Sequence, residues 1–149
     1  EADAALDLAF HDLTDGRPAK SDRVEFRGRE IVVPKAEGVV ARFGFGDLCD
    51  SPMGPGDYLA IAKRYRSVIV SNVPLMSSER RDVARRFVTM IDTFYDNHVH
   101  MVFSADAPPQ GLYYGDDWGF EFDRTISRLM EMQSADYIEA ARFHASQTV

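Results

Sequence analysis

Residues 67–103 constrain the fold more than any other part of the sequence. Residues 78–97 have apolar side chains on one helical face, at Val83, Phe87, Met90, Ile91 and Phe94. That spacing predicts a long amphipathic helix. A short apolar run lies on each side of it, at residues 68–70 and 99–103, and each run predicts a strand. Two strands joined by a helix pair in parallel with a right-handed crossover. This βαβ unit predicts an α/β protein.

The flanking segments predict a small antiparallel extension and further helices. Residues 24–26, 31–33 and 39–43 have the composition of strands and are separated by turn residues, which predicts a three-stranded meander. Helices are expected at residues 2–13, 58–65 and 123–143, and a loop at residues 106–119. We therefore expect one α/β domain over residues 1–149 with a mixed sheet and flanking helices. Its parts are an N-terminal helix (2–13), a β-meander (23–45) and an α/β unit (57–143).

The net charge of -7 argues against a nucleic-acid-binding protein, because such binding needs clustered Lys and Arg. One stretch departs from this average. Residues 17–42 hold seven basic and four acidic residues, which gives 7 - 4 = +3. Two interpretations stay open for this stretch: a solvated hairpin face, which we favour, or a basic ribbon that meets an acidic partner.

The single cysteine, Cys49, excludes an intramolecular disulfide and suits a reducing compartment. The acidic neighbours Asp47 and Asp50 argue against a reactive thiolate, so a small buried side chain is the favoured interpretation. No apolar run approaches the ~18 residues that a membrane span needs, and the acidic start does not resemble a signal peptide. These features predict a cytoplasmic protein without a transmembrane segment.

The sequence contains no complete phosphate-binding loop. The nearest string, residues 14–21 (TDGRPAKS), ends in Lys-Ser but has Thr14 and Ala19 where the motif needs glycine, and Pro18 removes a donor. We expect no cofactor in this chain alone. A metal site at His98 and His100 is not expected either, because the sequence offers no convincing third ligand.

Four arginines beside apolar helical stripes are the candidate catalytic residues. Arg85 should point outward and Arg86 should be half-buried at the flank of its helix. Arg124 and Arg128 share a helical face with Glu131, opposite an apolar face formed by Ile126, Leu129, Met130, Gln133 and Tyr137. One interpretation is a solvated face with an Arg128–Glu131 pair. The other is a basic edge that meets a phosphate or an adjacent subunit.

Weak candidates for ligand binding follow the two parallel strands. Asn72 comes after the first strand and Asp106 after the second, and ligands tend to gather at the carboxyl ends of parallel strands. Turn formation and helix capping explain the same residues, and we favour that alternative.

Several ordered motifs resemble the C-terminal portion of the ZapE-type, lactation-elevated AAA-type P-loop ATPases (ATPase family gene one-like). They include FGFGDLC at residues 43–49, DYLAIA at 57–62, RRFVTMID at 85–92 and FDRTISRLMEM at 122–132. Shorter matches lie at residues 28–33, 70–74, 95–96, 104–105 and 112–113.

The resemblance implies a fragment of an ATPase that uses ATP and Mg in the full-length parent. The phosphate loop and the acidic metal-binding strand would lie in the missing N-terminal half, and Arg85, Arg86, Arg124 and Arg128 would be sensor-type arginines. It also implies a link to cell division, with a tubulin-like division protein as partner, or to protein quality control, and it is compatible with a homo-oligomer. The alternative function is a non-catalytic interaction domain that recruits a client or a division protein.

Overall fold

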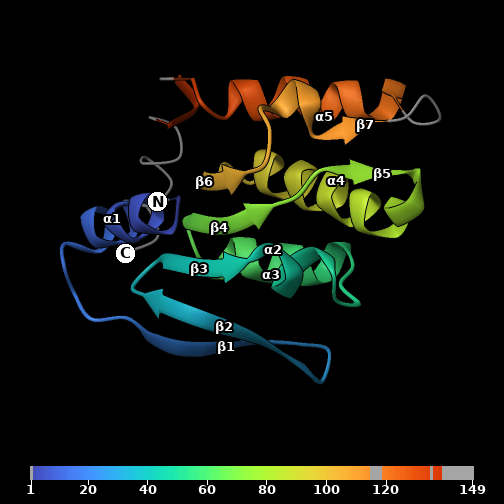
Figure 1. Ribbon diagram of the computed structural model, residues 1–149. Helices are drawn as coiled ribbons and strands as arrows, with labels where there is room; N and C mark the ends of the chain where they lie inside the picture. The colour runs from blue at the N-terminus through green and yellow to red at the C-terminus, as the bar shows by residue number, and fades with distance from the viewer. Residues whose placement is uncertain (1, 115–118, 135, 139–149) are drawn as a thin grey trace.

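The computed structural model describes residues 2–114, 119–134 and 136–138 (Figure 1). They form a mixed α/β fold, as predicted. In chain order the elements are α1 (Ala2–Thr14), β1 (Lys20–Phe26), β2 (Arg29–Glu37), β3 (Val40–Gly44), α2 (Phe45–Cys49), α3 (Pro55–Arg64), β4 (Ser67–Val73), β5 (Met76–Ser77), the 3-10 turn η1 (Ser78–Arg80), α4 (Arg81–Asp96), β6 (His100–Ala105), the 3-10 turn η2 (Pro109–Gly111), β7 (Tyr113–Tyr114) and α5 (Gly119–Glu131).

A five-stranded sheet of order β1-β2-β3-β4-β6 forms the centre of the molecule. The β1–β2 and β2–β3 pairs are antiparallel, and this confirms the predicted meander. The β3–β4 and β4–β6 pairs are parallel, so the βαβ unit is also confirmed. The carboxyl ends of β3, β4 and β6 consequently lie at one edge of the sheet.

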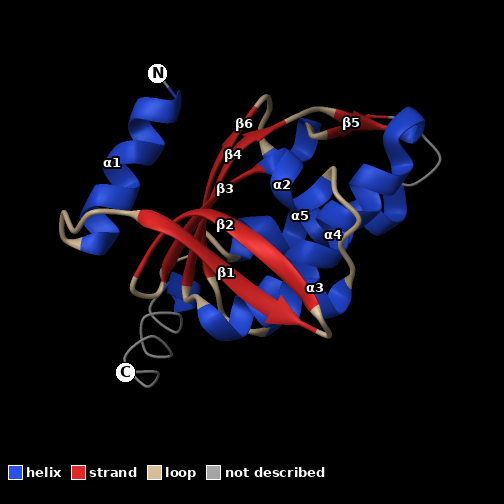
Figure 2. Ribbon diagram, turned by 90° about the horizontal axis from the view of Figure 1, so that it is seen from below, coloured by secondary structure: helices blue, strands red, loops and turns tan. Residues whose placement is uncertain are grey.

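Helices cover both faces of the sheet (Figure 2). On one face α1 packs through Leu6 and Phe10 against Val40 and Ile69. The other face carries α2, α3, α4 and α5, whose apolar side chains pack with alternate strand residues such as Val68. Because side chains alternate along a strand, successive residues of β4 belong to different cores.

The helix α4 lies at the centre of the larger core. Its predicted apolar stripe is buried, and the ring of Phe87 lies 6.0 Å from Phe45, 6.4 Å from Phe103 and 6.2 Å from Phe122, measured between centroids. These contacts fix the rotation of α4, and they therefore also fix where its arginines point.

The hairpin between β1 and β2 turns through two residues with positive φ, Arg27 (50°) and Gly28 (78°). This conformation matches the twist of the strands, and glycine adopts it readily. The tip of the hairpin packs on α3. A methyl group on Gly56 would lie 2.2 Å from the Phe26 ring, so only glycine allows this close approach.

Three features differ from the prediction. The short helix α2 and the small parallel β5–β7 sheet were not expected. The last helix, predicted over residues 123–143, begins at Gly119 and ends at Glu131, and residues 136–138 are helical again. The hydroxyl of Ser134 accepts a hydrogen bond from the Tyr137 amide and so caps that new segment. The predicted end at residue 143 lies outside the described residues.

The apolar face of α5 is rotated relative to the expected one. Phe122, Thr125 and Leu129 are buried, whereas Met130 is 49% exposed and Gln133 is also exposed. Placing Met130 in the core was therefore wrong. No helix among the described residues has the length and apolar character that a membrane crossing requires.

Candidate functional site

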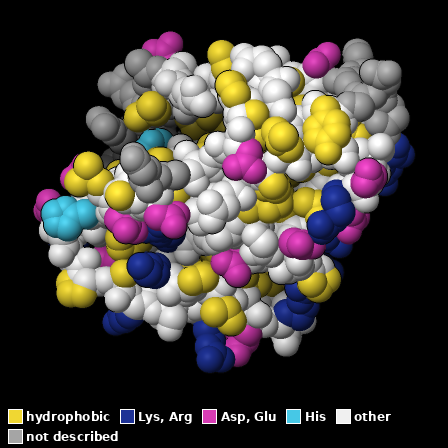
Figure 3. All heavy atoms as spheres, in the orientation of Figure 1, with side chains coloured by type: hydrophobic (Ala, Val, Ile, Leu, Met, Phe, Trp, Pro, Cys, Tyr) yellow, Lys and Arg dark blue, Asp and Glu magenta, His cyan; other side chains and the backbone are white. Residues whose placement is uncertain are grey.

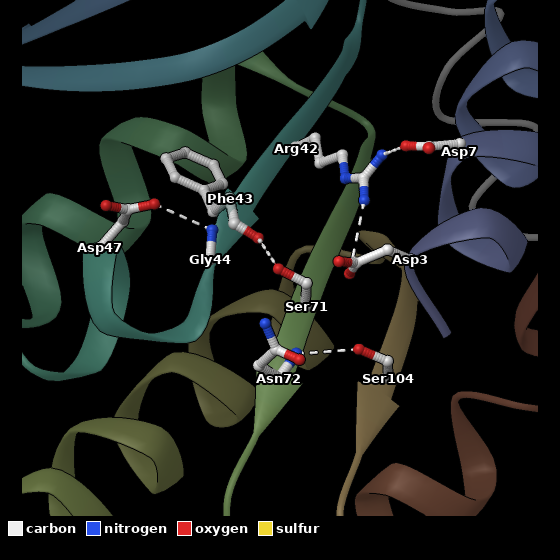
Figure 4. A network of polar contacts seen from close by, with 9 residues as sticks. All are labelled: Asp3, Asp7, Arg42, Phe43, Gly44, Asp47, Ser71, Asn72 and Ser104. Carbon is white, nitrogen blue, oxygen red and sulfur yellow. Dashed lines mark hydrogen bonds and ion pairs between the residues drawn. The ribbon is translucent and has the colours of Figure 1, made fainter. Parts of the chain in front are cut away.

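Polar side chains gather where β4 and β6 end (Figure 4). The Asn72 amide donates a hydrogen bond to Ser104 Oγ at 2.8 Å. Asn72 has a φ of 63°, and the β4–β6 register shifts between Val70 and Val73. An irregular strand end of this kind turns the following residues away from the sheet. Asn72 itself is exposed.

Other polar groups at this edge satisfy local backbone. The Asp47 carboxylate accepts a hydrogen bond from the Gly44 amide at 2.8 Å and so caps α2.

On the α1 side of the sheet, Arg42 donates a hydrogen bond to Asp7, and its guanidinium lies 4.0 Å from Asp3 (Figure 4). The hydrogen bond from Arg42 lowers the pKa of the Asp7 carboxyl. Arg42 therefore fastens α1 to the sheet.

A cleft of about 370 Å³ opens beside this edge, between α2, β5 and the start of α4. Asn72 lies at its margin. Across the cleft Arg80 donates a hydrogen bond to Asp50 at 2.7 Å, and both side chains are 55% exposed. The sequence prediction missed Arg80. Its position just before the apolar stripe of α4 was visible, but nothing in the sequence pointed to Asp50, which lies 30 residues upstream.

The other strand-end candidate, Asp106, lines a different cavity. This second cavity, of about 460 Å³, lies between the end of β6, η2 and α5, and its walls are mostly apolar, with Phe87, Phe103 and Leu129 among them. Asn72 and Asp106 therefore line different cavities, although the Asp106 amide donates a hydrogen bond to the carbonyl oxygen of Val73, the residue after Asn72. Ligand binding by either residue stays a prediction.

Arg86 is half-buried, as expected, with its side chain 29% exposed. It donates a hydrogen bond to the Cys49 carbonyl oxygen at 3.2 Å and lies 3.7 Å from Asp82. Cys49 is the last residue of α2, and a cation near the carboxyl end of a helix is favourable. Arg86 therefore ties α2 to α4.

Arg85 is exposed, as expected. It lines a shallow groove on the outer side of α4 together with Arg81, Asp82 and Arg86. Among the described residues, no hydrogen bond or ion pair involves Arg85. Its guanidinium is therefore available to a group outside the described chain.

Arg124 and Arg128 converge on a single carboxylate, Asp92 of α4. Arg128 donates a hydrogen bond to it, and Arg124 approaches it at 3.7 Å. The Arg128 guanidinium also lies 5.1 Å from the centre of the Tyr95 ring. The partner of Arg128 is thus Asp92 and not the expected Glu131. Glu131 instead shares a hydrogen bond with the Tyr95 hydroxyl, and this bond raises the pKa of the tyrosine. These two arginines join α5 to α4.

Cys49 is fully buried, as favoured from the sequence. Burial raises the pKa of its thiol to about 12, and the nearby Asp50 adds a smaller effect in the same direction. The described part of the chain holds no group of three His, Cys, Asp or Glu side chains that could bind a metal ion.

Comparison with known proteins decides the family. The AFG1-like ATPase family matches residues 1–141. The chain belongs to this family. It is 34% identical to the cell division protein ZapE of Escherichia coli K12, over 93% of this chain and 37% of that protein. It is 36% identical to lactation elevated protein 1 homolog B of Danio rerio, over 88% of this chain and 32% of that protein.

A third relative, an uncharacterized protein of Schizosaccharomyces pombe, is 37% identical over 89% of this chain and 35% of its own length. The chain thus spans about a third of the length of the relatives it matches. No solved structure matches it. The family resemblance carried by the sequence motifs is confirmed.

Proposed function

We propose that this chain is the C-terminal module of an AAA-type ATPase whose ATP and Mg sites are built mainly by sequence outside it. Family membership is the observation that carries the proposal. The parent protein would bind and hydrolyse ATP in the service of cell division or protein quality control. The buried Cys49 thiol suits a reducing compartment, and we place the parent in the cytoplasm on that ground.

The described residues do not fit a triphosphate site. The string that resembles a phosphate loop lies in the connection between α1 and β1, where Gly16 packs on the His11 ring and Lys20 begins a strand. No helix of the described chain follows that string directly, so its amides cannot form the cradle that phosphates need. We therefore expect no measurable ATP hydrolysis by this chain alone.

The contribution of the module to catalysis would come from Arg85. An arginine stabilises negative charge on a transferring phosphoryl group only if its guanidinium is free to reach it. Arg86, Arg124 and Arg128 bind groups of their own chain, whereas Arg85 binds none among the described residues. We accordingly assign the sensor-type role to Arg85 and structural roles to the other three.

The test compares Arg85→Ala with Arg124→Ala in the full-length parent. Both arginines are exposed, so both variants should fold normally. We expect Arg85→Ala to lower kcat for ATP by at least about tenfold, since arginines that contact the transferring phosphate contribute more than that. Arg124→Ala should leave kcat within about twofold of wild type. Equal rates for the two variants would remove Arg85 from the mechanism.

Isothermal titration calorimetry of this chain with MgATP tests the other half of the proposal. Binding should be undetectable or weak, because the string that most resembles a phosphate loop leads into the strand β1 and not into a helix. Tight binding would show that the chain holds a nucleotide site of its own.

The second candidate function is a non-catalytic interaction module that recruits a client or a division protein. It is favoured by the internal engagement of Arg86, Arg124 and Arg128 and by the exposed apolar side chains near the cleft. Under this function, Arg85→Ala in the parent would leave hydrolysis unchanged. A homo-oligomer is compatible with both functions, and the acidic net charge argues against nucleic acid in either case.

A further inference from the structure

The strand β6 forms an open edge of the central sheet. It pairs with β4 on one side, and no strand of the described chain pairs with it on the other. The amides of His100 and Asp106 donate hydrogen bonds on the β4 side. Alternate amides of a parallel strand point to the same side, so those of Met101, Phe103 and Ala105 face the open edge. Backbone donors and acceptors at this edge are therefore left for an additional partner.

The two edge strands of the sheet differ in their protection against further pairing. The other edge strand, β1, carries four charged residues among its seven, at Lys20, Asp22, Arg23 and Glu25. Charged side chains on an edge strand oppose pairing with another chain. The sequence of β6, HMVFSA, contains no Asp, Glu, Lys or Arg. An edge without such protection is a template to which an extended segment can add as one more strand.

The second cavity, of about 460 Å³, lies beside this edge. Figure 1 shows α5 beyond β6, on the side away from β4, and Figure 3 shows hydrophobic side chains at the surface between α5 and the sheet. The cavity is lined by Phe103 and Ala105 of β6 and by buried side chains such as Phe87 and Leu129. Its volume lies within the range of small-ligand pockets, about 300–1,000 Å³, and admits one large apolar side chain. A strand that adds to β6 places its side chains next to Phe103 and so at the cavity.

Asp106 is the single charged residue among the described residues that line the second cavity. It is exposed, and its carboxylate makes no hydrogen bond or ion pair with a described residue. In the cleft, by contrast, Arg80 and Asp50 neutralise each other. The negative charge at the second cavity is thus uncompensated, and the net charge of -7 acts in the same direction. Both favour a segment that carries Lys or Arg near its apolar side chain.

We propose that β6 binds an extended polypeptide segment with one large apolar side chain and a lysine or arginine two residues away. The backbone of the segment pairs with the open edge of β6, its apolar side chain fills the second cavity, and its basic side chain pairs with Asp106. In this mode of recognition backbone hydrogen bonds supply affinity, whereas the pocket and the carboxylate supply specificity. The inference adds a binding site to the second candidate function, and it does not depend on ATP hydrolysis or on the role of Arg85.

Fluorescence anisotropy with labelled peptides tests this proposal on the purified chain. The reference peptide consists of threonines with a central phenylalanine and a lysine two positions to either side of it. Alternate side chains of a strand lie on one face, so this spacing presents the ring and a lysine together in either strand direction. Serine in place of the phenylalanine should weaken binding by at least about tenfold. Glutamate in place of the lysines should weaken it by at least about threefold.

Methylation of the peptide backbone tests the strand geometry itself. In an added strand, only one of the two alternate sets of peptide amides faces β6. N-methylation of that set should abolish binding, and N-methylation of the other set should leave the affinity within about twofold of the reference. A peptide that only inserted its ring into the cavity would not show this alternation.

Two variants of the chain test the β6 side of the contact. Asp106→Asn removes the carboxylate charge and should weaken binding of the reference peptide by about threefold. Ala105→Pro removes an amide that faces the open edge and spares the hydrogen bonds to β4, so it should weaken binding by about threefold or more. Glu25→Gln on β1 changes the net charge as Asp106→Asn does and should leave binding unaltered. Circular dichroism verifies folding, and if Ala105→Pro unfolds the chain, the methylated peptides test the strand pairing.

No binding of the reference peptide, or equal binding of the phenylalanine and serine peptides, would overturn the proposal. So would an equal response to the two methylated sets, because strand addition requires them to differ. Equal affinities of Asp106→Asn and Glu25→Gln would refute the role of the Asp106 carboxylate. Self-association of the chain that Ala105→Pro abolishes would assign the edge to a second copy. None of these results bears on the kinetics of Arg85→Ala, so the two proposals fail separately.

Discussion

Replacing Arg128 with alanine tests whether its guanidinium joins α5 to α4. In the structure this side chain is 25% exposed, and it donates a hydrogen bond to Asp92, which is 29% exposed. Its guanidinium also lies over the Tyr95 ring. Arg124 reaches the same carboxylate from 3.7 Å and is 64% exposed. The two arginines therefore share a partner but differ in burial.

The expected cost follows from these contacts. A hydrogen bond to a charged group contributes about 1.5–3 kcal/mol, and partial solvent exposure places this one near the lower end. The contact with the tyrosine ring adds about 0.5 kcal/mol. We therefore expect Arg128→Ala to lower the free energy of unfolding by about 2 kcal/mol, which corresponds to a drop in Tm of roughly 4–8 °C. Arg124→Ala should cost less than about 0.5 kcal/mol.

Urea unfolding of the purified chain at pH 7, followed by circular dichroism, measures both variants. The midpoint should move for Arg128→Ala with an unchanged slope, because the surface exposed on unfolding stays the same. The contact between α4 and α5 would be refuted as a source of stability if Arg128→Ala and Arg124→Ala had the same midpoint. A free, sensor-type Arg128 would give that result.

Two further predictions concern the hairpin and its surroundings. Arg29 lies 3.3 Å from the Asp57 carboxylate, whose side chain is 3% exposed, so Arg29→Ala should lower the free energy of unfolding by about 2 kcal/mol. Arg23→Ala breaks an exposed ion pair and should lower it by less than about 0.5 kcal/mol. Thermal unfolding compares the two variants. The Tyr65 hydroxyl donates a hydrogen bond to Asp22 and lowers its pKa below 3.8, so this stabilisation is present above about pH 4 and is lost as the pH falls through the pKa of the folded state. Asp22→Asn should therefore be less stable than wild type at pH 7, and urea midpoints should show this difference shrinking towards pH 3. A constant difference across that range would exclude the carboxylate as its source.

Much of the fold follows from local signals in the sequence. The apolar run at residues 68–70 has strand composition on both faces, and the structure buries it between α1 and the helices of the other face. The boundaries of the last helix were harder to predict. The helix α5 ends at Glu131, and the Ser134 hydroxyl then accepts a hydrogen bond from the Tyr137 amide. A serine within an amphipathic pattern does not reveal in advance which amide it will bind.

The candidate site was less predictable, because its contacts join distant segments. The spacing of apolar residues correctly predicted that Arg85 is exposed and that Arg86 is half-buried. It could not show that Arg86 binds the carbonyl of Cys49, 37 residues away, or that Arg128 pairs with Asp92, 36 residues away. Charge spacing along one helix suggested Glu131 for Arg128, yet the tertiary partner is Asp92. Local spacing identifies neighbours on a helix, and packing between helices decides which of them meet.

Arg85 differs from the other arginines of α4 in its electrostatic surroundings. In an isolated helix it would face Arg81 one turn earlier, a like-charge pair that costs about 0.2–0.5 kcal/mol. Asp82, three residues before it, approaches Arg86. Arg85 itself has no ion pair among the described residues that would offset that repulsion. A negative group supplied from outside the described chain would offset it, whether it belongs to a nucleotide held by the rest of the parent or to an acidic partner.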